Sequence, residues 1–572
     1  MYNNKENLYS LKLHGYKKNR CLEAIGRFKF FLSCLFFGFF LIGFKITNLS
    51  ILYNKNILET NNYFKKNNIY NKRADIVDRN GVILATSLPW DDLCANPRLI
   101  QEEDKLELSK SIAKILDDSN EKEIYKKLNS KKSFVYLKRS ITPKQYNAIE
   151  KLKQHGIFKL KKYKRYYPHQ KHASHILGGV NIDNTGIKGI EKEYDKILRD
   201  KNFINQNKKL NLSIDIRIQK ILDDKLGATI SKHKALGGAG IILDIKNSEI
   251  LAMSSLPQFN PNKMSKLTKK KEFNKTTSGV YELGSVFKSL TIAMALDKEI
   301  VNEDTIYDAT EPLKEGKYTI HDYHPQERHL KISECITYSS NICFAQVGQD
   351  LGEKNIVEYI NKMGLNNKAE IEIPEIGHPL FFGNIFLPSS WKKTNIMTFS
   401  YGHGVAVSPL QFVNAFTSVI NGGNFRNSTL IKDKYLNNVQ INRVIKEETS
   451  YKVRKLLRKV VSNKEGSGDK ANVPGYSVAG KTGTAIKNYS NRYNNNKNIT
   501  SFIGFFPSYD PQFLVFIMVD DPKKIKETFN FVTGGWVAAP TVKKIIEEMS
   551  PMLGILPKKQ LDKNYNHASL NN

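Results

Sequence analysis

A serine and a lysine three residues apart are the first candidates for chemistry in this 572-residue chain. Ser285 and Lys288 stand at the start of an apolar stretch, residues 289–296, which predicts a buried helix. Residues three apart share a helix face, so the Lys288 amine can approach the Ser285 hydroxyl. Burial lowers the pKa of a lysine, which can then act as the base that a serine nucleophile needs. This pattern also occurs by chance, in which case Ser285 is an ordinary helix cap and Lys288 a solvated side chain.

Two further groups could supply the proton relay and the substrate-binding side chains that Ser285 and Lys288 lack. Ser339-Ser340-Asn341 follows a stretch that is predicted to be helical from about residue 332. A hydroxyl there can relay a proton to a leaving amine, and an asparagine amide can bind a substrate peptide bond. On a predicted strand lies Lys481-Thr482-Gly483-Thr484, where a lysine and two hydroxyls can bind a carboxylate and a glycine leaves room for substrate.

An α+β domain is predicted to position these groups. Five strands are expected, at residues 239–244, 249–254, 476–485, 501–506 and 513–519. Helices between them, and a last helix at about 537–549, predict an antiparallel sheet that is covered on both faces. The polar segment 487–498 is predicted to be a mobile loop because it cannot bury enough apolar surface.

The N-terminal region predicts a membrane anchor. Residues 30–44 are uncharged and apolar, and Lys29 and Lys45 can snorkel so that residues 28–52 complete a span. A cleaved signal peptide is the alternative, but bulky residues follow the apolar run where a peptidase needs small ones. The basic flank before the run predicts a cytoplasmic N-terminus.

Between the anchor and residue 235 no nucleophile and base stand at useful spacing. Alternating apolar residues around Asn80-Gly81 predict a hairpin, and residues 101–155 are predicted to be helical and solvated. This region is interpreted as a scaffold or docking surface.

The chain carries 88 Lys+Arg against 56 Asp+Glu, a formal charge of +32. Nucleic-acid binding is one explanation for this charge. The lysines are scattered through every region without an aromatic-interleaved basic stripe, which favours general lysine enrichment with some attraction to anionic membranes.

The cysteines and histidines predict neither a redox motif nor a metal site. On a shared helix, Cys335 and Cys343 would lie about 12 Å apart, beyond disulfide reach, so free buried thiols are expected. The histidine-rich segment 321–329 contains a proline and lacks H-E-x-x-H spacing, which favours a polar loop near the cleft. His403 is assigned to a buried turn that can line the site from below, and Trp536 to a hydrophobic lock of the last helix.

Taken together, these groups resemble the signature of the penicillin-binding, active-site-serine family, where S-x-x-K, S-x-N and K-T-G occur in this order. The resemblance extends to class B penicillin-binding proteins of the septal, cell-division type. The segments that carry it are residues 73–85, 165–168, 183–191 and 212–215. One departure is Leu283, where many relatives have a proline that would pre-order the turn.

The resemblance implies an α+β architecture with a single N-terminal transmembrane helix and two extracytoplasmic domains. Its parts would be a cytoplasmic stub (1–27), the anchor (28–52), a β-rich elongated pedestal of the dimerisation type (53–235), a transpeptidase domain (236–556) and a disordered tail (557–572).

It also implies a role for each matched residue. Ser285 would be the acylated nucleophile and Lys288 its base. Ser339 would shuttle protons, and Asn341 would orient the donor amide. The substrate carboxylate would be bound by Lys481, Thr482 and Thr484 beside Gly483, and the backbone N–H groups of Ser285 and Thr484 would form the oxyanion hole.

The implied reaction is peptidoglycan D,D-transpeptidation, in which stem peptides that end in D-Ala-D-Ala are cross-linked with release of D-Ala. It needs no metal or organic cofactor, and β-lactams would acylate Ser285. The implied partners are a SEDS-type glycosyltransferase and other division proteins at the plasma (inner) membrane, and no nucleic acid. The alternatives are an elongation-type transpeptidase, a D,D-carboxypeptidase or β-lactamase-like hydrolase, and a β-lactam-sensing receptor.

Overall fold

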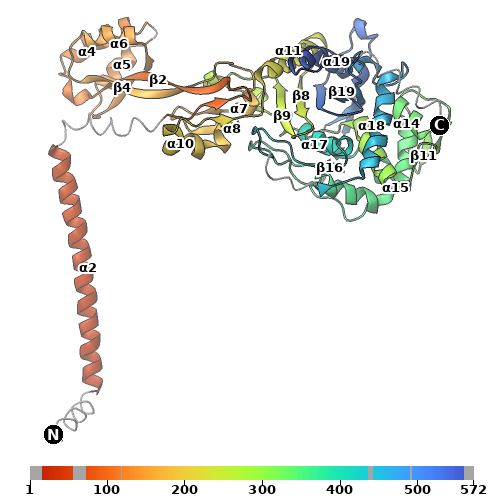
Figure 1. Cartoon of the computed structure of the whole chain (residues 1–572). Helices are drawn as coiled ribbons and strands as arrows, with labels where there is room; N and C mark the ends of the chain where they lie inside the picture. Colours follow the sequence, from red (N-terminus) through yellow and green to blue (C-terminus); the bar gives the residue numbers. More distant parts are fainter. Residues whose placement is uncertain (1–15, 56–71, 118, 436–441, 490–491, 559–572) are drawn as a thin grey trace. The chain divides into compact units, whose positions relative to one another are not determined.

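The computed structural model describes residues 16–55, 72–117, 119–435, 442–489 and 492–558 (Figure 1). The predicted tail beyond residue 558 and the first fifteen residues of the predicted stub lie outside these ranges. Packing divides the chain into two compact units, Met1–Tyr70 with Asp91–Lys162, and Asn71–Trp90 with Tyr163–Asn572. The domain bounds drawn from the sequence stay a prediction.

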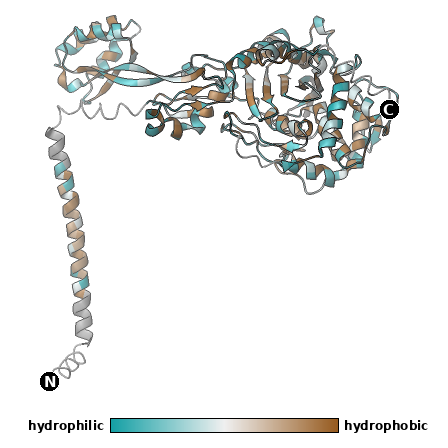
Figure 2. Cartoon of the chain, viewed as in Figure 1, coloured by the Kyte–Doolittle hydropathy of each residue, from teal (hydrophilic) through white to brown (hydrophobic). Residues whose placement is uncertain are grey.

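The helix α2 (Tyr16–Lys55) contains the predicted anchor. Its segment Ile25–Asn48 has 24 residues with a mean hydropathy of 2.0, and none of that stretch is buried. At 1.5 Å per residue it is about 36 Å long, enough to cross a hydrocarbon core of about 30 Å. Figure 2 shows this apolar segment as a brown band along α2. Among the described residues this is the one helix that is long and apolar enough to span a membrane, which fits a single-pass membrane protein.

The first unit also holds a small mixed core. Its elements are η2 (Pro97–Leu99), α4 (Asp104–Ile115), α5 (Glu121–Leu128), β3 (Val135–Ile141) and α6 (Pro143–Glu150). The prediction that residues 101–155 are helical was wrong for β3, which pairs with β2 (Ile83–Ala95) and buries Leu137 and Ile141. The strand escaped prediction because its stability depends on cross-strand partners that are distant in sequence.

The second unit begins with the predicted hairpin around Asn80-Gly81. β1 (Ile76–Val77) pairs antiparallel with β2, which confirms the prediction. Gly81 takes a φ of +84°, and the Asp78 carboxylate accepts the N–H groups of Asn80 and Val82 at 2.8 Å. The strand β4 (Ile157–Tyr166) begins in the first unit and ends in the second. Short elements follow: α7 (Ser174–Leu177), β5 (Gly179–Val180), β6 (Gly186–Lys188), α8 (Gly189–Glu193), α9 (Asp195–Leu198), α10 (Lys201–Asn205) and β7 (Leu210–Asn211).

A buried ion network connects these short elements. Arg73 is fully buried, and its guanidinium donates to Glu191 Oε2 at 2.8 Å and to Asp195 Oδ1 at 2.5 Å. Arg165 donates to Glu191 Oε1 at 2.6 Å, so one carboxylate pairs with two arginines. The loss of any partner would leave an uncompensated buried charge, so the network favours a single arrangement of these segments.

A five-stranded antiparallel sheet forms the centre of the second unit, as predicted. In spatial order its strands are β18 (Ala479–Tyr489), β19 (Arg492–Phe506), β20 (Phe513–Asp520), β8 (Gly237–Asp244) and β9 (Glu249–Leu256). The helices α11 (Ile216–Lys232) and α19 (Gly534–Met552) pack on one face, against Ile242 and Ile517. The helices α13 (Lys288–Asp297) and α17 (Pro409–Ile420) pack on the other, against Ile241 and Phe516.

The remaining elements surround this sheet. They are η3 (Pro261–Lys266), α12 (Lys269–Glu272), η4 (Gly284–Phe287), β10 (Ile306–Ala309), β11 (Leu313–Glu315), β12 (Tyr318–Ile320), β13 (Arg328–Lys331), α14 (Ile332–Tyr338), α15 (Asn341–Lys362), β14 (Leu380–Phe381), α16 (Lys393–Ser400), β15 (Val405–Ala406), β16 (Asn424–Phe425), β17 (Asn442–Arg443), α18 (Glu447–Ser462), η5 (Asp469–Ala471) and η6 (Lys526–Thr528).

One predicted loop is largely paired. β18 continues to Tyr489 and β19 begins at Arg492, so most of residues 487–498 extend the sheet, while residues 490–491 lie outside the description. An antiparallel ladder can continue on backbone hydrogen bonds alone, which a prediction based on burial does not count.

Candidate active site

The turn that carries Ser285 lies against the edge strand of the sheet. Ser285 belongs to the 3-10 turn η4, and Lys288 begins α13 directly after it. Gly284 has a φ of +62°, and a Cβ there would lie 2.5 Å from the backbone oxygen of Thr484 in β18. Glycine is therefore required both for the backbone conformation and for the close approach of the two segments.

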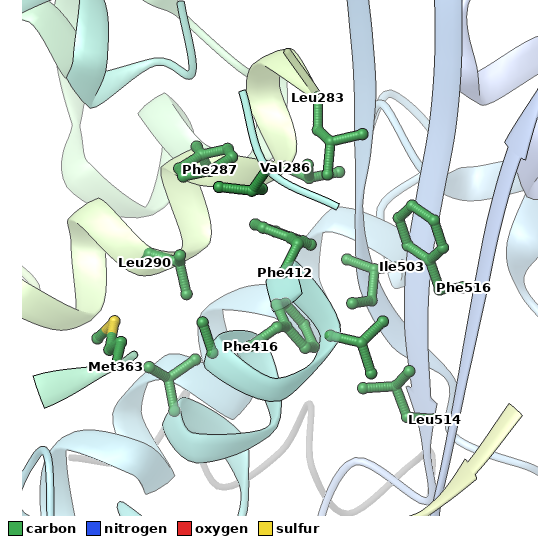
Figure 3. Packing of buried hydrophobic residues seen from close by; sticks show 14 of the residues in the cluster. Leu283, Val286, Phe287, Leu290, Met363, Phe412, Phe416, Ile503, Leu514 and Phe516 are labelled. Carbon is green, nitrogen blue, oxygen red and sulfur yellow. The ribbon is translucent and has the colours of Figure 1, made fainter. Parts of the chain in front are cut away.

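Apolar side chains hold this turn in place. Figure 3 shows Val286, Phe287 and Leu290 pointing toward Phe412 of α17, with the sheet residue Ile503 beside them. Every residue from Lys288 to Leu296 is buried, which confirms the predicted buried helix. A helix that is packed on all sides positions its first residue more rigidly than a surface helix would.

The amine of Lys288 is fully buried and faces the Ser339 turn. Its Nζ donates to the backbone oxygen of Ser339 at 2.6 Å, to Ser339 Oγ at 3.2 Å and to Asn341 Oδ1 at 2.7 Å. The S-x-x-K and S-x-N groups are thus joined through direct hydrogen bonds.

The turn itself separates two helices. α14 ends at Tyr338, Ser339 takes the left-handed conformation (φ 63°, ψ 42°), and Ser340 caps α15 by accepting the N–H of Cys343 at 3.0 Å. The left-handed residue turns the chain so that Ser339 Oγ and Asn341 Oδ1 both face Lys288.

Lys481 completes the cluster from β18, which lies at one edge of the sheet. Its Nζ donates to Ser339 Oγ at 2.8 Å, so one hydroxyl accepts from two lysines. It also donates to the backbone oxygen and Oγ1 of Thr482, both at 3.3 Å. Groups that stand almost 200 residues apart in the chain therefore converge.

Burial lowers the pKa of Lys288 to about 7, against the opposing effect of the Asp322 carboxylate. Burial and the neighbouring Lys288 charge lower the pKa of Lys481 well below that of an ordinary lysine. Two amines in one dry cluster favour a state with fewer protons, since like charges repel strongly there. A neutral lysine amine is the form that can take the proton of a serine hydroxyl.

Two protein-family models match the chain. The penicillin-binding protein transpeptidase domain matches residues 238–547, and the penicillin-binding protein dimerisation domain matches residues 68–212. The chain belongs to the class B penicillin-binding proteins. This confirms the family that the sequence motifs resembled.

Several relatives are similar over most of their length. The probable peptidoglycan D,D-transpeptidase FtsI of Caulobacter vibrioides is 33% identical, over 96% of this chain and 93% of the relative. Stage V sporulation protein D of Bacillus subtilis is 32% identical, over 86% of this chain and 80% of the relative. The peptidoglycan D,D-transpeptidase FtsI of Buchnera aphidicola is 28% identical, over 94% and 96% respectively.

The structure adds an acidic residue to the site of this penicillin-binding protein that motif reasoning missed. The Asp322 carboxylate accepts the N–H groups of Asn341 at 2.5 Å and Ile342 at 3.0 Å, at the start of α15. The amide of Asn341 also donates to the backbone oxygen of His321 at 2.9 Å. The histidine-rich segment therefore supports the Ser339 turn from outside, and its only sequence signal was its polar character.

The substrate-binding group on β18 has partners of its own. The Thr482 hydroxyl donates to Ser467 Oγ at 3.1 Å, and Thr484 Oγ1 accepts the N–H of Gly534 at 3.0 Å. A Cβ at Gly483 would lie 2.4 Å from the backbone oxygen of Leu283. The glycine is therefore needed for packing against the Ser285 turn, and its role in binding substrate stays a prediction.

The expectation of free thiols was wrong for Cys335 and Cys343, which form a disulfide with a Cα–Cα distance of 5.9 Å. They do not share a helix, because Ser339 ends α14 and α15 begins in a new direction. Cys94 is buried and free, as expected.

His403 and Trp536 flank the cluster in different ways. His403 Nδ1 lies 3.6 Å from Glu282 Oε2, and burial, together with the Lys288 charge, lowers the pKa of His403 to about 4. Trp536 is half-buried and contacts Phe529, Phe531 and the Lys470 amine. It therefore belongs to an aromatic group at the start of α19, and its role as a hydrophobic lock of that helix stays a prediction.

Proposed function

We propose that this protein is a serine-type peptidoglycan D,D-transpeptidase that works in septal cell-wall synthesis. The observation that carries the proposal is the convergence of Lys288, Ser339, Asn341 and Lys481 in one hydrogen-bonded cluster after the Ser285 turn. The names of the relatives support it, since two of those named above are called FtsI and peptidoglycan D,D-transpeptidase.

Acylation starts when Ser285 Oγ attacks the carbonyl carbon of the penultimate D-Ala of a stem peptide. The neutral Lys288 amine takes the hydroxyl proton as the new C–O bond forms. The carbonyl electrons move onto the oxygen, which accepts the backbone N–H groups of Ser285 and Thr484. When the C–N bond breaks, the leaving D-Ala nitrogen takes a proton that passes from Lys288 through the Ser339 hydroxyl.

The hydrogen bond from Lys288 to Ser339 Oγ, at 3.2 Å, supports this proton path. In the second half of the reaction, an amine from a neighbouring stem attacks the acyl carbon. That amine loses one proton to Lys288, and Ser285 leaves with a proton, so the enzyme returns to its first state with a new amide bond formed.

Substrate binding is assigned to the remaining groups of the cluster. Lys481 and the Thr482 and Thr484 hydroxyls bind the terminal carboxylate. For this, Lys481 redirects an N–H that it donates to Thr482, and Thr482 redirects the O–H that it donates to Ser467. Both ends of the Asn341 amide already have a partner, yet its oxygen keeps a lone pair and its nitrogen an N–H for the donor peptide bond. β-Lactams present a similar carboxylate and carbonyl, so they acylate Ser285 as well.

The anchor supports a place for the reaction. The basic residues before residue 28 favour a cytoplasmic N-terminus, which supports a catalytic domain outside the plasma (inner) membrane. A SEDS-type glycosyltransferase supplies the glycan strands there, and the pedestal and anchor contact it together with other division proteins.

The test of the nucleophile is labelling with a fluorescent penicillin. The wild-type chain is expected to give a labelled band and Ser285→Ala none. Ser289→Ala is the matched control, because its hydroxyl lies four residues on, in α13, and bonds to the Val286 backbone oxygen. Persistent labelling of Ser285→Ala would place the nucleophile elsewhere.

The reaction class is tested with a donor peptide that ends in D-Ala-D-Ala and an acceptor amine. A transpeptidase yields the new amide together with free D-Ala. A product that consists of the hydrolysed donor alone, in the presence of abundant amine, would instead identify a carboxypeptidase-type hydrolase.

A further inference from the structure

The two cysteines of the disulfide, Cys335 and Cys343, lie on either side of the S-x-N turn. Cys335 is in the last turns of α14 and Cys343 is in the first turn of α15, and both side chains are fully buried. The two cysteines stand eight positions apart, so the covalent link closes a short loop that contains Ser339 and Asn341.

This turn needs support, because its conformation is unfavourable and its surroundings are charged. Ser339 has a φ of 63°, a left-handed conformation that residues other than glycine rarely adopt. Its Oγ accepts from Lys288 at 3.2 Å and from Lys481 at 2.8 Å. A small change in the backbone angles of Ser339 would move its hydroxyl out of hydrogen-bond reach of Lys288 or of Lys481.

Non-covalent contacts support the turn on both sides. The Ser340 hydroxyl and the Asp322 carboxylate accept the first N–H groups of α15, and so fix the start of that helix. The backbone N–H groups of Ser339 and of Ser340, the latter at 2.9 Å, both donate to the Cys335 oxygen in α14. The disulfide joins the same two helices with a covalent bond.

We propose that the Cys335–Cys343 disulfide is a positioning device for acyl transfer, which holds Ser339 and Asn341 in register with Lys288. The inference rests on the catalytic roles proposed above for those residues. Reduction by a dithiol breaks the S–S bond, gives two thiols and leaves the dithiol as a cyclic disulfide. The reduced turn can then reach other conformations, and fewer molecules hold the reactive arrangement at any moment.

The experiment compares oxidised and dithiothreitol-treated full-length protein in detergent, with thiols counted by alkylation and mass spectrometry. In the reduced protein we expect the first-order acylation constant at saturating β-lactam to fall about tenfold, which corresponds to about 1.4 kcal/mol. The half-saturating concentration should change less than the acylation constant, because the carboxylate-binding group Lys481, Thr482 and Thr484 lies on β18, outside the linked turn. The total amount of acyl-enzyme should stay unchanged, because the protein remains folded. Reoxidation with glutathione disulfide should restore the rate.

The double variant Cys335→Ala/Cys343→Ala tests the proposal even if dithiothreitol does not reduce the buried disulfide. It should acylate as slowly as the reduced protein and no longer respond to dithiothreitol. Cys94→Ala is the matched control, since this buried cysteine is free, and it should keep the response of the wild type.

Two results would overturn the inference. One is an acylation constant equal to that of the oxidised wild type, measured either in fully reduced protein or in the double variant. The other is a loss of acylable protein without a change in rate, which would mean that the disulfide only supports folding. Failure of the proposed catalytic roles is distinguishable, because Ser339→Ala and Asn341→Ala would then acylate at the wild-type rate.

Discussion

The clearest quantitative prediction concerns the pH dependence of acylation. If the neutral amine of Lys288 is the base, the rate follows the fraction of protein in which that amine is unprotonated. With a pKa of about 7 for Lys288, this fraction rises with pH. It is about one tenth at pH 6, about half at pH 7 and about nine tenths at pH 8.

The expected result is therefore an increase of about tenfold between pH 6 and pH 8, followed by a plateau. An ordinary lysine with a pKa of about 10.4 would give an increase of about a hundredfold over the same interval, with no plateau below about pH 10. The Asp322 carboxylate opposes the lowering of the Lys288 pKa, and the Lys288 charge in turn lowers the pKa of Lys481 and of His403. The protonation states of these groups are therefore coupled.

The assay is stopped-flow acylation by a chromogenic β-lactam well below saturation, where the second-order rate constant reports the groups of the free enzyme. Lys288→Met should lose about a hundredfold or more in rate and also lose the pH dependence. A profile that is flat in the wild type, or that rises a hundredfold without a plateau, would refute Lys288 as a base of lowered pKa.

The same shift carries a prediction about stability. The unfolded chain keeps Lys288 protonated up to about pH 10.4, whereas the folded chain releases the proton at about pH 7. Between these values the unfolded state binds more protons, so this group makes stability rise with pH across that window. Lys288→Met removes a buried ionisable group and should unfold at a higher temperature than the wild type at pH 7.

Three more substitutions test other parts of the structure. Asp322→Asn should move the midpoint of the acylation profile to lower pH, because the carboxylate raises the pKa of Lys288; an unchanged midpoint would contradict this. Gly284→Ala should slow acylation about tenfold or more, since its Cβ would displace the turn from Thr484, as stopped-flow rates would show. Glu191→Gln should lower the free energy of unfolding by about 3–5 kcal/mol by leaving two buried arginines poorly paired, as measured in thermal or denaturant unfolding.

Matched controls separate these effects from general damage. Gly316→Ala places a side chain at a similar φ of +58° with no atom within 4 Å, so it should acylate normally. Glu193→Gln changes an exposed carboxylate two residues from the buried one and should unfold as the wild type does. Equal acylation rates in Gly284→Ala and Gly316→Ala would contradict the packing argument. Equal stability of Glu191→Gln and Glu193→Gln would contradict the ion-network argument.

The sequence by itself determined the elements whose signals are local. The all-round apolar pattern of residues 289–296 predicted a buried helix, and the alternating runs predicted the five strands of the central sheet. The apolar stretch near the N-terminus predicted the anchor helix. The three catalytic groups were recognised from short spacings, because nucleophile, base and carboxylate binder each need particular residue types close together in the chain.

Only the tertiary structure decided the features that depend on distant partners. β3 became a strand because β2 offers a pairing edge, and Cys335 meets Cys343 because a left-handed Ser339 separates two helices that spacing alone would have merged. Asp322 gained its place beside Asn341 through the packing of a loop that carries no motif. The lowered pKa of Lys288 likewise comes from burial, since desolvation is a property of the folded interior rather than of the chain.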